Sequence, residues 1–264
     1  MGYNPHKQRT VKEEVTYNLI NIVKLARKQH HNGSQYNIKN LLILPSLNML
    51  DLRVMEKLKM VGKRTNIVAV EKDGWIAGHI RTKLRERYKN VTVIRSNLNE
   101  ITKEQFQEYA PNGFDFAYLD SCSEPTDKNM RWMQNELKPS LAEKYFLASN
   151  WTGADRDNQA KKYHHHHAAS MLCANNHAGR YANAISLAMG NTVYDEISYK
   201  EKNQAVAMNL CLQTNYSEDC QFEFNFDLRN IGYKDQKHTS LSLLINKIKI
   251  EEPETWREIE GAVY

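Results

Sequence analysis

The chain has 264 residues, of which 41% are hydrophobic and 25% charged, an ordinary composition for a globular protein. No stretch approaches the roughly 20 apolar residues that a membrane-spanning helix needs, and the N-terminal segment lacks the apolar core of a secretory signal. The net charge is +5, and the four cysteines lie too far apart for a dense disulfide framework, so we expect a reducing, cytoplasmic setting.

Positive charge is concentrated in one part of the chain. Residues 53–89 hold eleven Lys and Arg against four Asp and Glu, and residues 81–87 are the densest part, whereas residues 251–260 are acidic. Such asymmetry suits a polyanionic partner, nucleic acid first, and makes Arg81 and Arg85 candidate substrate contacts. A solvated outer helix face produces the same pattern, and the sequence leaves both interpretations open.

Short apolar runs alternate with helical patterns along the first 150 residues. Apolar residues repeat at helical spacing over residues 11–28, and a turn follows at 30–34. The expected strands are 41–45, 67–70, 91–94, 114–120 and 145–149, and the expected helices between them are 47–61, 76–88, 102–109 and 127–138. Continuous apolar runs are typical of strands buried on both faces. This alternation predicts an α/β fold with right-handed βαβ crossovers, a parallel sheet and helices on both faces.

The pattern changes after a long helix expected at about 159–189. Residues 192–199 and 205–213 predict an antiparallel hairpin, residues 221–228 alternate as a half-buried strand, and residues 241–250 are a further candidate strand. We therefore expect a helical N-terminal extension over 1–37, an α/β domain over 38–215, and a β-containing extension over 216–264 packed on the same domain.

Five β/α units closed by an antiparallel hairpin form the element order of class I, Rossmann-like S-adenosylmethionine-dependent methyltransferases, which the chain resembles over residues 38–215. The resemblance implies S-adenosylmethionine as cofactor, bound outside the carboxyl ends of the strands. Glu71 stands where the family's acid accepts both ribose hydroxyls, a role that suits a carboxylate. Asn97 stands where the family contacts the adenine, and Asp120 where it borders the methyl-bearing end. The cofactor-binding residues so implied are Leu44, Pro45, Ser46, Glu71, Lys72, Asn97, Leu98 and Asp120.

The end of the first strand departs from the family's pattern. The family has a glycine-rich loop there, where the backbone approaches the cofactor closely. This chain has LILPSLNMLD over residues 42–51, so Pro45 and Ser46 are expected to form the turn, with Asp51 further along. Divergent members, including phage-encoded ones, are similar in pairing an "LP" first-strand end with an "LD" fourth motif. The departure bears on cofactor affinity rather than on the fold.

Residues 120–125, at the end of the fourth strand, limit the kinds of methyl transfer that the chain could catalyse. Enzymes that methylate the amino groups of bases usually carry an Asp/Asn-Pro-Pro-aromatic motif here, and the segment DSCSEP lacks it. Cys122 is a candidate catalytic nucleophile, because enzymes that form 5-methylcytosine use a thiolate, with a small buried cysteine as the alternative. Asp120 is the other candidate catalytic residue, with a turn-capping role as its alternative. Trp151 is placed either to stack on a substrate base or to pack at the sheet edge.

Four consecutive histidines occupy residues 164–167. On a helix, His166, Ser170, Cys173 and His177 would share one face, and zinc could use such ligands. The same segment is rich in alanine and other apolar residues, as expected of a helix packed on the sheet, and histidines that border the site or bind phosphate are a third interpretation. We expect no metal, with this set as the alternative.

The leading hypothesis is an S-adenosylmethionine-dependent methyltransferase acting on nucleic acid, in which catalysis depends largely on proximity and alignment. The second is a catalytically silent methyltransferase-like module that binds nucleic acid or a protein partner. A cofactor pocket filled by Leu47, Met49 or Trp75 would favour that module. The third is a nicotinamide-dependent oxidoreductase, against which the absent G-x-G-x-x-G motif and the closing hairpin both count.

Overall fold

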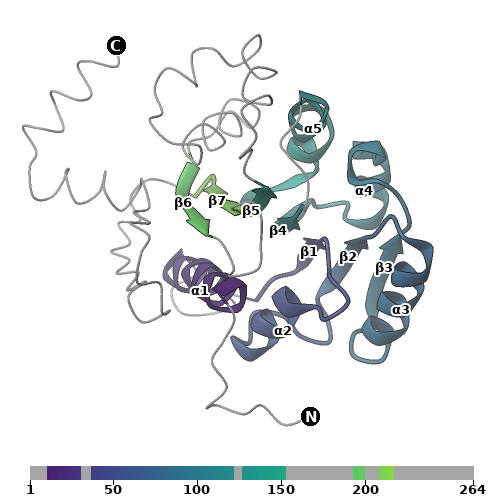
Figure 1. The fold of residues 1–264 in the computed structure, drawn as a ribbon, viewed down its shortest axis with the longest axis horizontal. Helices are drawn as coiled ribbons and strands as arrows, with labels where there is room; N and C mark the ends of the chain where they lie inside the picture. Colours follow the sequence, from purple (N-terminus) through teal and green to yellow (C-terminus); the bar gives the residue numbers. More distant parts are fainter. Residues whose placement is uncertain (1–10, 31–36, 122–126, 153–192, 200–207, 217–264) are drawn as a thin grey trace, which may run out of the picture.

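The computed structural model describes residues 11–30, 37–121, 127–152, 193–199 and 208–216, in which helices cover both faces of a seven-stranded sheet (Figure 1). The strands are β1 (Asn40–Ile43), β2 (Asn66–Val70), β3 (Asn90–Ile94), β4 (Phe114–Asp120), β5 (Leu141–Thr152), β6 (Val193–Tyr199) and β7 (Met208–Thr214). The helices are α1 (Val11–His30), α2 (Leu50–Lys57), α3 (Gly74–Arg85), α4 (Lys103–Tyr109) and α5 (Asp127–Trp132), with a 3₁₀ turn η1 (Leu98–Glu100).

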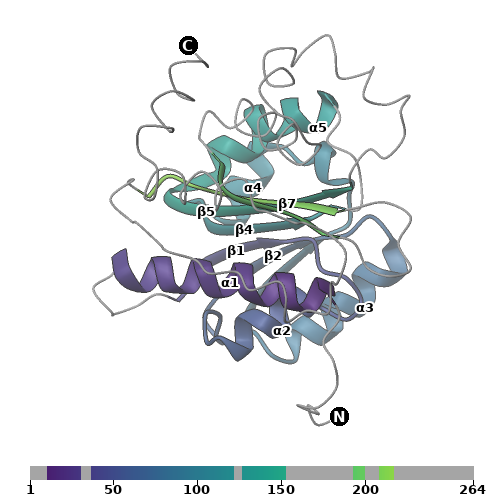
Figure 2. The same ribbon diagram turned by 60° about the vertical axis from the view of Figure 1, so that its left-hand side comes forward.

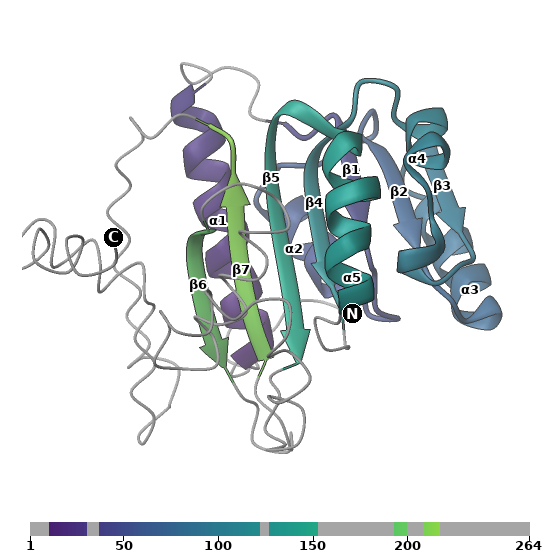
Figure 3. The same ribbon diagram turned by 90° about the horizontal axis from the view of Figure 1, so that it is seen from above.

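The strands lie in the order β3-β2-β1-β4-β5-β7-β6. Strands β1 to β5 are mutually parallel, whereas β7 runs antiparallel to β5 and β6 antiparallel to β7 (Figure 3). The predicted α/β fold, with a parallel sheet and a closing antiparallel hairpin, is thus confirmed.

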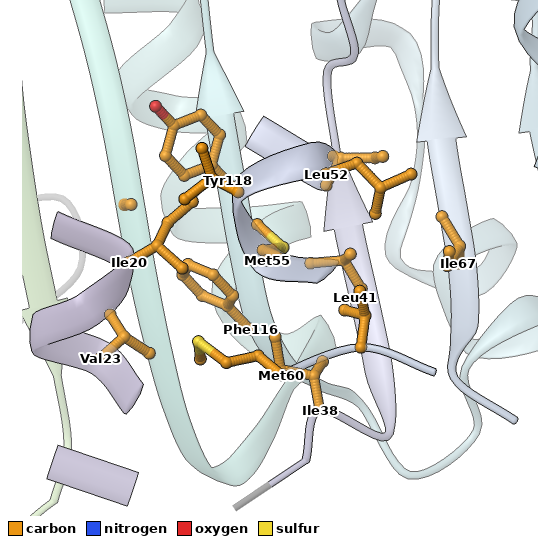
Figure 4. Close-up of a cluster of buried hydrophobic side chains, with 14 of the residues drawn as sticks. Ile20, Val23, Ile38, Leu41, Leu52, Met55, Met60, Ile67, Phe116 and Tyr118 are labelled. Carbon is orange, nitrogen blue, oxygen red and sulfur yellow. The ribbon is translucent and has the colours of Figure 1, made fainter. Parts of the chain in front are cut away.

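Two hydrophobic cores lie on the two faces of the sheet. Helices α1, α2 and α3 cover one face, and α4 and α5 cover the other (Figure 2). On the first face, Ile20 of α1 and Leu52 of α2 pack in one cluster with Phe116 of β4 (Figure 4). On the second face, the Phe106 and Phe114 rings meet edge to face with centroids 5.4 Å apart. Because successive strand residues point to opposite faces, the apolar runs supply both cores.

Helix α1 is tied to the α/β domain by a buried arginine. The Arg27 guanidinium donates to the Asp115 carboxylate over 2.8 Å and to the Asn37 carbonyl over 3.0 Å. The same carboxylate accepts the backbone amides of Lys39 and Asn40. Burial of an ion pair is offset only where such additional hydrogen bonds are present. Helix α1 therefore shares the core of the domain that follows it.

Helix α2 is shorter than its apolar spacing predicts. The expected helix over 47–61 is confined to Leu50–Lys57. Lys59, with φ 58°, takes the left-handed position after the helix, while the Met60 amide donates to the Met55 carbonyl. This hydrogen-bonded end closes the helix before Val61, even without glycine at the left-handed position.

The other elements match their predicted positions with small shifts. Helix α3 ends at Arg85, so Tyr88 lies beyond it and donates its hydroxyl to Glu56. Helix α5 ends at Trp132 and continues as a wider turn over Met133–Leu137. No helix among the described residues is long and apolar enough to cross a membrane. The helix predicted at 159–189 and the strands predicted at 221–228 and 241–250 lie outside the described residues.

Candidate functional site

The candidate site lies at the carboxyl ends of β1, β2 and β4. From β1 the chain continues to β2 and β3 on one side, while β4 and β5 lie on the other. The loops after β1 and β4 therefore diverge, and such a switch point is where open α/β sheets bind ligands. Glu71 and Asp120 lie directly at two of these strand ends.

The turn after β1 contains the left-handed residue that a glycine-rich loop would normally supply. Met49 has φ 45° and ψ 48°, and its amide donates to the Ser46 carbonyl over 2.9 Å. The Met49 side chain is buried in the core, and Pro45 is buried before it. Helix α2 thus begins after a tight turn in which methionine adopts a conformation that usually favours glycine.

Three charged side chains and one amide meet at the end of β4, and we call them the acidic cluster: Lys12, Asp51, Asp120 and Asn150. The Lys12 ammonium forms an ion pair with the Asp120 carboxylate. The Asn150 amide donates to the other Asp120 oxygen over 2.7 Å. The β4–β5 register places Asn150 directly opposite Asp120, so the sheet itself sets this hydrogen bond.

Asp51 is the buried member of the acidic cluster. Its side chain is 5% exposed, and its Oδ2 has no hydrogen-bond partner among the described residues. Burial, followed by the negative charge of Asp120, raises the pKa of Asp51 to about 7. Desolvation and a like charge both disfavour the ionised carboxylate. Near neutral pH, Asp51 therefore exchanges a proton beside Asp120.

The acidic cluster adds functional candidates that the sequence analysis missed. Lys12 was part of an expected amphipathic helix, Asn150 part of a polar segment after the fifth strand, and Asp51 only a residue beyond the turn. Asn150 could have been found from the expected pairing of β4 with β5. Polar residues near the ends of two neighbouring strands lie close together at the sheet edge. No comparable signal connects Lys12 with Asp120, which lie 108 positions apart in the sequence.

The second part of the site lies at the ends of β2 and β3. Glu71 Oε1 accepts the Asp73 amide over 2.8 Å, and Asn97 donates to Glu100 over 2.9 Å. The Glu71 amide donates to the Ile94 carbonyl, which extends the hydrogen bonding between β2 and β3 by one residue. The paired ends of β2 and β3 thus bring Glu71 and Asn97 onto neighbouring loops. A carboxylate has two acceptor oxygens, so Glu71 keeps capacity for a ligand hydroxyl.

The remaining candidate residues for the cofactor pocket differ in how far they are exposed. Lys72 is exposed, and Leu44 and Leu98 are half-buried against the second core. Of the three side chains considered as pocket fillers, Trp75 and Leu47 are 72% and 40% exposed, and Met49 alone is buried.

The proposed substrate and metal residues are described only in part. The Arg81 guanidinium donates to the Val93 carbonyl over 3.1 Å, and Arg85 is exposed at the end of α3. The Trp151 backbone pairs with Asn209, but its side chain lies outside what the structure describes. The same holds for Cys122, His166, Ser170, Cys173 and His177. No group of three metal-ligating side chains occurs within the described part of the chain.

Comparisons with known proteins find similarity in structure and none in sequence. No protein-family profile matches the chain, and no curated protein matches it in sequence. A protein assigned as a sarcosine dimethylglycine methyltransferase of Galdieria sulphuraria aligns with TM-score 0.49 and 11% identity, over 77% of this chain and 84% of that one. An O-methyltransferase of Bacillus cereus in complex with SAH aligns with TM-score 0.44 and 10% identity, over 80% and 84%. An S-adenosylmethionine-dependent methyltransferase of Aquifex aeolicus aligns with TM-score 0.41 and 12% identity, over 81% and 99%.

The strand order decides the architecture. Five parallel strands closed by an antiparallel hairpin are the arrangement expected from the resemblance, and the structure gives the order β3-β2-β1-β4-β5-β7-β6. The fold is that of a Rossmann-like methyltransferase. A shared methyltransferase fold does not by itself establish an activity, because unrelated functions occupy the same folds.

Proposed function

We propose that the protein is an S-adenosylmethionine-dependent methyltransferase acting on nucleic acid. The observation that carries the proposal is the acidic cluster at the switch point of a methyltransferase-type sheet. There, a buried carboxyl lies beside a carboxylate that already holds an ammonium group.

The chemistry of these side chains fits the cofactor. S-adenosylmethionine carries a ribose diol on its nucleoside part and an ammonium and a carboxylate at its methionine end, with the sulfonium between the two parts. Asp51 Oδ2 is a buried oxygen without a hydrogen-bond donor among the described residues, and Asp120 pairs with the Lys12 ammonium. These groups suit a cation, and Glu71 suits a diol. Asp120 and Asp51 would therefore hold the ammonium of the methionine end, and Glu71 and Asn97 the nucleoside end.

The chain's own residues would act mainly by binding and orientation. The bound cofactor supplies a methyl group on a sulfonium, which is already a good leaving group. Asn150 fixes the Asp120 carboxylate, so its orientation is set before any ligand arrives. Asp51, with a pKa of about 7, holds or releases a proton at neutral pH as the local charge changes. Alignment of bound reactants is a large source of rate in such reactions.

A nucleic-acid acceptor is supported by charge. Residues 53–89 combine eleven cations with four carboxylates. Of those carboxylates, Glu56 is held by Arg87 and Tyr88, and Asp73 accepts two amides of α3. A surface rich in cations attracts the phosphate backbone irrespective of sequence.

The test is a calorimetric titration with S-adenosylmethionine, S-adenosylhomocysteine and, as a control, NAD. We expect both sulfur ligands to bind and to raise the melting temperature, because a ligand that binds only the native state stabilises it. Glu71→Ala should abolish binding and leave the fold intact, and Glu108→Ala, an exposed glutamate of α4, should bind as the wild type does. Unchanged affinity in Glu71→Ala would remove the cofactor assignment. Transfer of labelled methyl groups to RNA or DNA then tests the acceptor.

A catalytically silent module is the second candidate, and the Lys12–Asp120 ion pair favours it. Lys12 places an ammonium where the methionine end would bind, so the two cations would compete for one carboxylate. If Lys12 blocks the site permanently, wild-type protein will bind neither sulfur ligand. Binding by Lys12→Met alone would identify the silent module.

A further inference from the structure

The outer face of α3 carries an exposed pair of stacked aromatic rings. Trp75 is 72% exposed, the largest exposed fraction among the exposed large apolar side chains of the described residues. The His79 ring stacks on it with centroids 5.8 Å apart and planes 8° from parallel. His79 lies one helical turn along from Trp75, so it holds one face of the indole in place. With 72% of Trp75 exposed, the indole keeps surface that a planar ligand can contact.

Helical geometry places cations on both sides of this ring pair. The buried residues of α3 are Ala77, Ile80 and Leu84, so the opposite side faces solvent. At 100° per residue, Lys83 lies about 80° to one side of Trp75 and Arg85 about 80° to the other. The helix contains no carboxylate between Gly74 and Arg85. The acidic residues that flank the helix in sequence are Glu71 and Asp73 before it, of which Asp73 caps the helix, and Glu86 beyond its end.

Two glycines of α3 lie close to Trp75 in the sequence, and their surroundings differ. A Cβ on Gly78 would meet nothing within 4 Å, so no packing contact explains glycine inside this helix. Glycine inside a helix destabilises the helix relative to alanine, and it leaves room for close approach. At Gly74, a Cβ would meet the Arg95 guanidinium at 2.7 Å, so the bare backbone lets Arg95 lie against the start of α3.

We propose that the outer face of α3 binds single-stranded nucleic acid, with an unpaired base stacked on Trp75 and phosphates contacted by Lys83, Arg85 and Arg95. Aromatic stacking platforms flanked by cations bind single strands in this way, with little sequence preference. Because α3 begins at the carboxyl edge of the sheet, Trp75 lies at the same edge as Glu71. The proposal rests on the nucleic-acid acceptor proposed above and specifies where that acceptor binds.

The experiment measures fluorescence anisotropy of a labelled oligothymidylate of about 15 nucleotides with the full chain, and of the same strand paired as a duplex. We expect the single strand to bind more tightly than the duplex, whose bases are already stacked. Trp75→Ala should weaken single-strand binding about 5- to 100-fold, and Trp75→Phe should restore most of it. The matched control is Leu25→Ala, which removes an exposed apolar side chain from α1 and should have no effect.

A second pair of variants tests the cations. Lys83→Gln should weaken binding and reduce the slope of log affinity against log salt by about 0.7, the value for one phosphate contact on a single strand. Lys138 is exposed on the opposite face of the sheet, so Lys138→Gln should change neither the affinity nor the salt slope.

Three results would overturn the proposal: equal binding by Trp75→Ala and wild type, equal binding of duplex and single strand, or binding to anionic vesicles but not to the oligonucleotide. Calorimetry with S-adenosylhomocysteine on the same preparations separates the two proposals. If S-adenosylhomocysteine does not bind but Trp75→Ala still weakens single-strand binding, the result counts against the methyltransferase. If S-adenosylhomocysteine binds but Trp75→Ala does not weaken single-strand binding, the result counts against the α3 surface.

Discussion

The two ends of the candidate site are built in opposite ways. At the β4 end, the acidic cluster is largely buried, and one of its carboxyls has its pKa raised to about 7. At the β2 end, Glu71 and Asn97 lie in loops and hydrogen-bond within their own turns. Buried charges interact strongly because little water screens them, whereas exposed charges interact weakly. Changes at the β4 end should therefore affect stability and its pH dependence, and changes at the β2 end mainly ligand binding.

The largest expected effect follows from Asp51→Asn. The pKa of Asp51 is about 7 in the folded protein against an ordinary value of 3.8. Between these values the folded state holds a proton that the unfolded state releases, so stability falls as the pH rises from about 4 to 7. Asparagine does not ionise, so the stability of the Asp51→Asn variant does not fall for this reason over that pH range. At pH 8 it should be more stable than wild type by up to about 4 kcal/mol, since one pKa unit corresponds to about 1.4 kcal/mol.

Urea unfolding at pH 4, 6 and 8 provides the measurement. The stability difference between Asp51→Asn and wild type should grow with pH and level off above pH 7. Glu108→Gln, on an exposed face of α4, is the matched control and should show no such growth. A pH-independent difference for Asp51→Asn would mean that Asp51 is ionised in the folded protein, and the contrast between the two ends would then be lost.

Much of the fold could be predicted from the sequence, because its signals are local. The runs at β1, β2 and β4 are apolar on both faces, and Glu71 and Asp120 place a polar residue at the ends of β2 and β4. The β2 end was predicted for the same reason, since Glu71 directly follows its strand. The acidic cluster was not, because Lys12 and Asp51 reach Asp120 only through the packing of α1 and α2. The end of α2 was also misplaced, since Lys59 adopts a left-handed conformation that usually indicates glycine.

Met49 and Lys59 are the non-glycine residues with a left-handed backbone in the described part of the chain, and replacing each with glycine compares a buried with an exposed position. Met49→Gly relieves a backbone strain of about 1 kcal/mol but removes a buried side chain whose loss costs about 2–5 kcal/mol. The net result should be a loss of roughly 1–4 kcal/mol. Lys59→Gly relieves similar strain at an exposed position and should stabilise the protein by about 0.5–1 kcal/mol. Thermal unfolding of both variants measures the difference, and a shared sign would show that burial does not govern the turn after β1.

A small effect is also expected from Lys12→Met, which removes the ammonium while keeping an apolar stem of similar length. Lys12 lowers the pKa of Asp51, so its loss should raise that pKa further and extend the decline in stability to higher pH. The loss of the ion pair with Asp120 should cost about 1 kcal/mol at pH 8, the upper range for pairs that retain some contact with water. Lys138→Met, at an exposed position, should leave both the stability and its pH profile unchanged. If the Lys12→Met profile instead coincides with that of wild type, Lys12 does not act electrostatically on Asp51. The buried end would then consist of Asp51, Asp120 and Asn150 alone, and α1 would contribute to it only through packing.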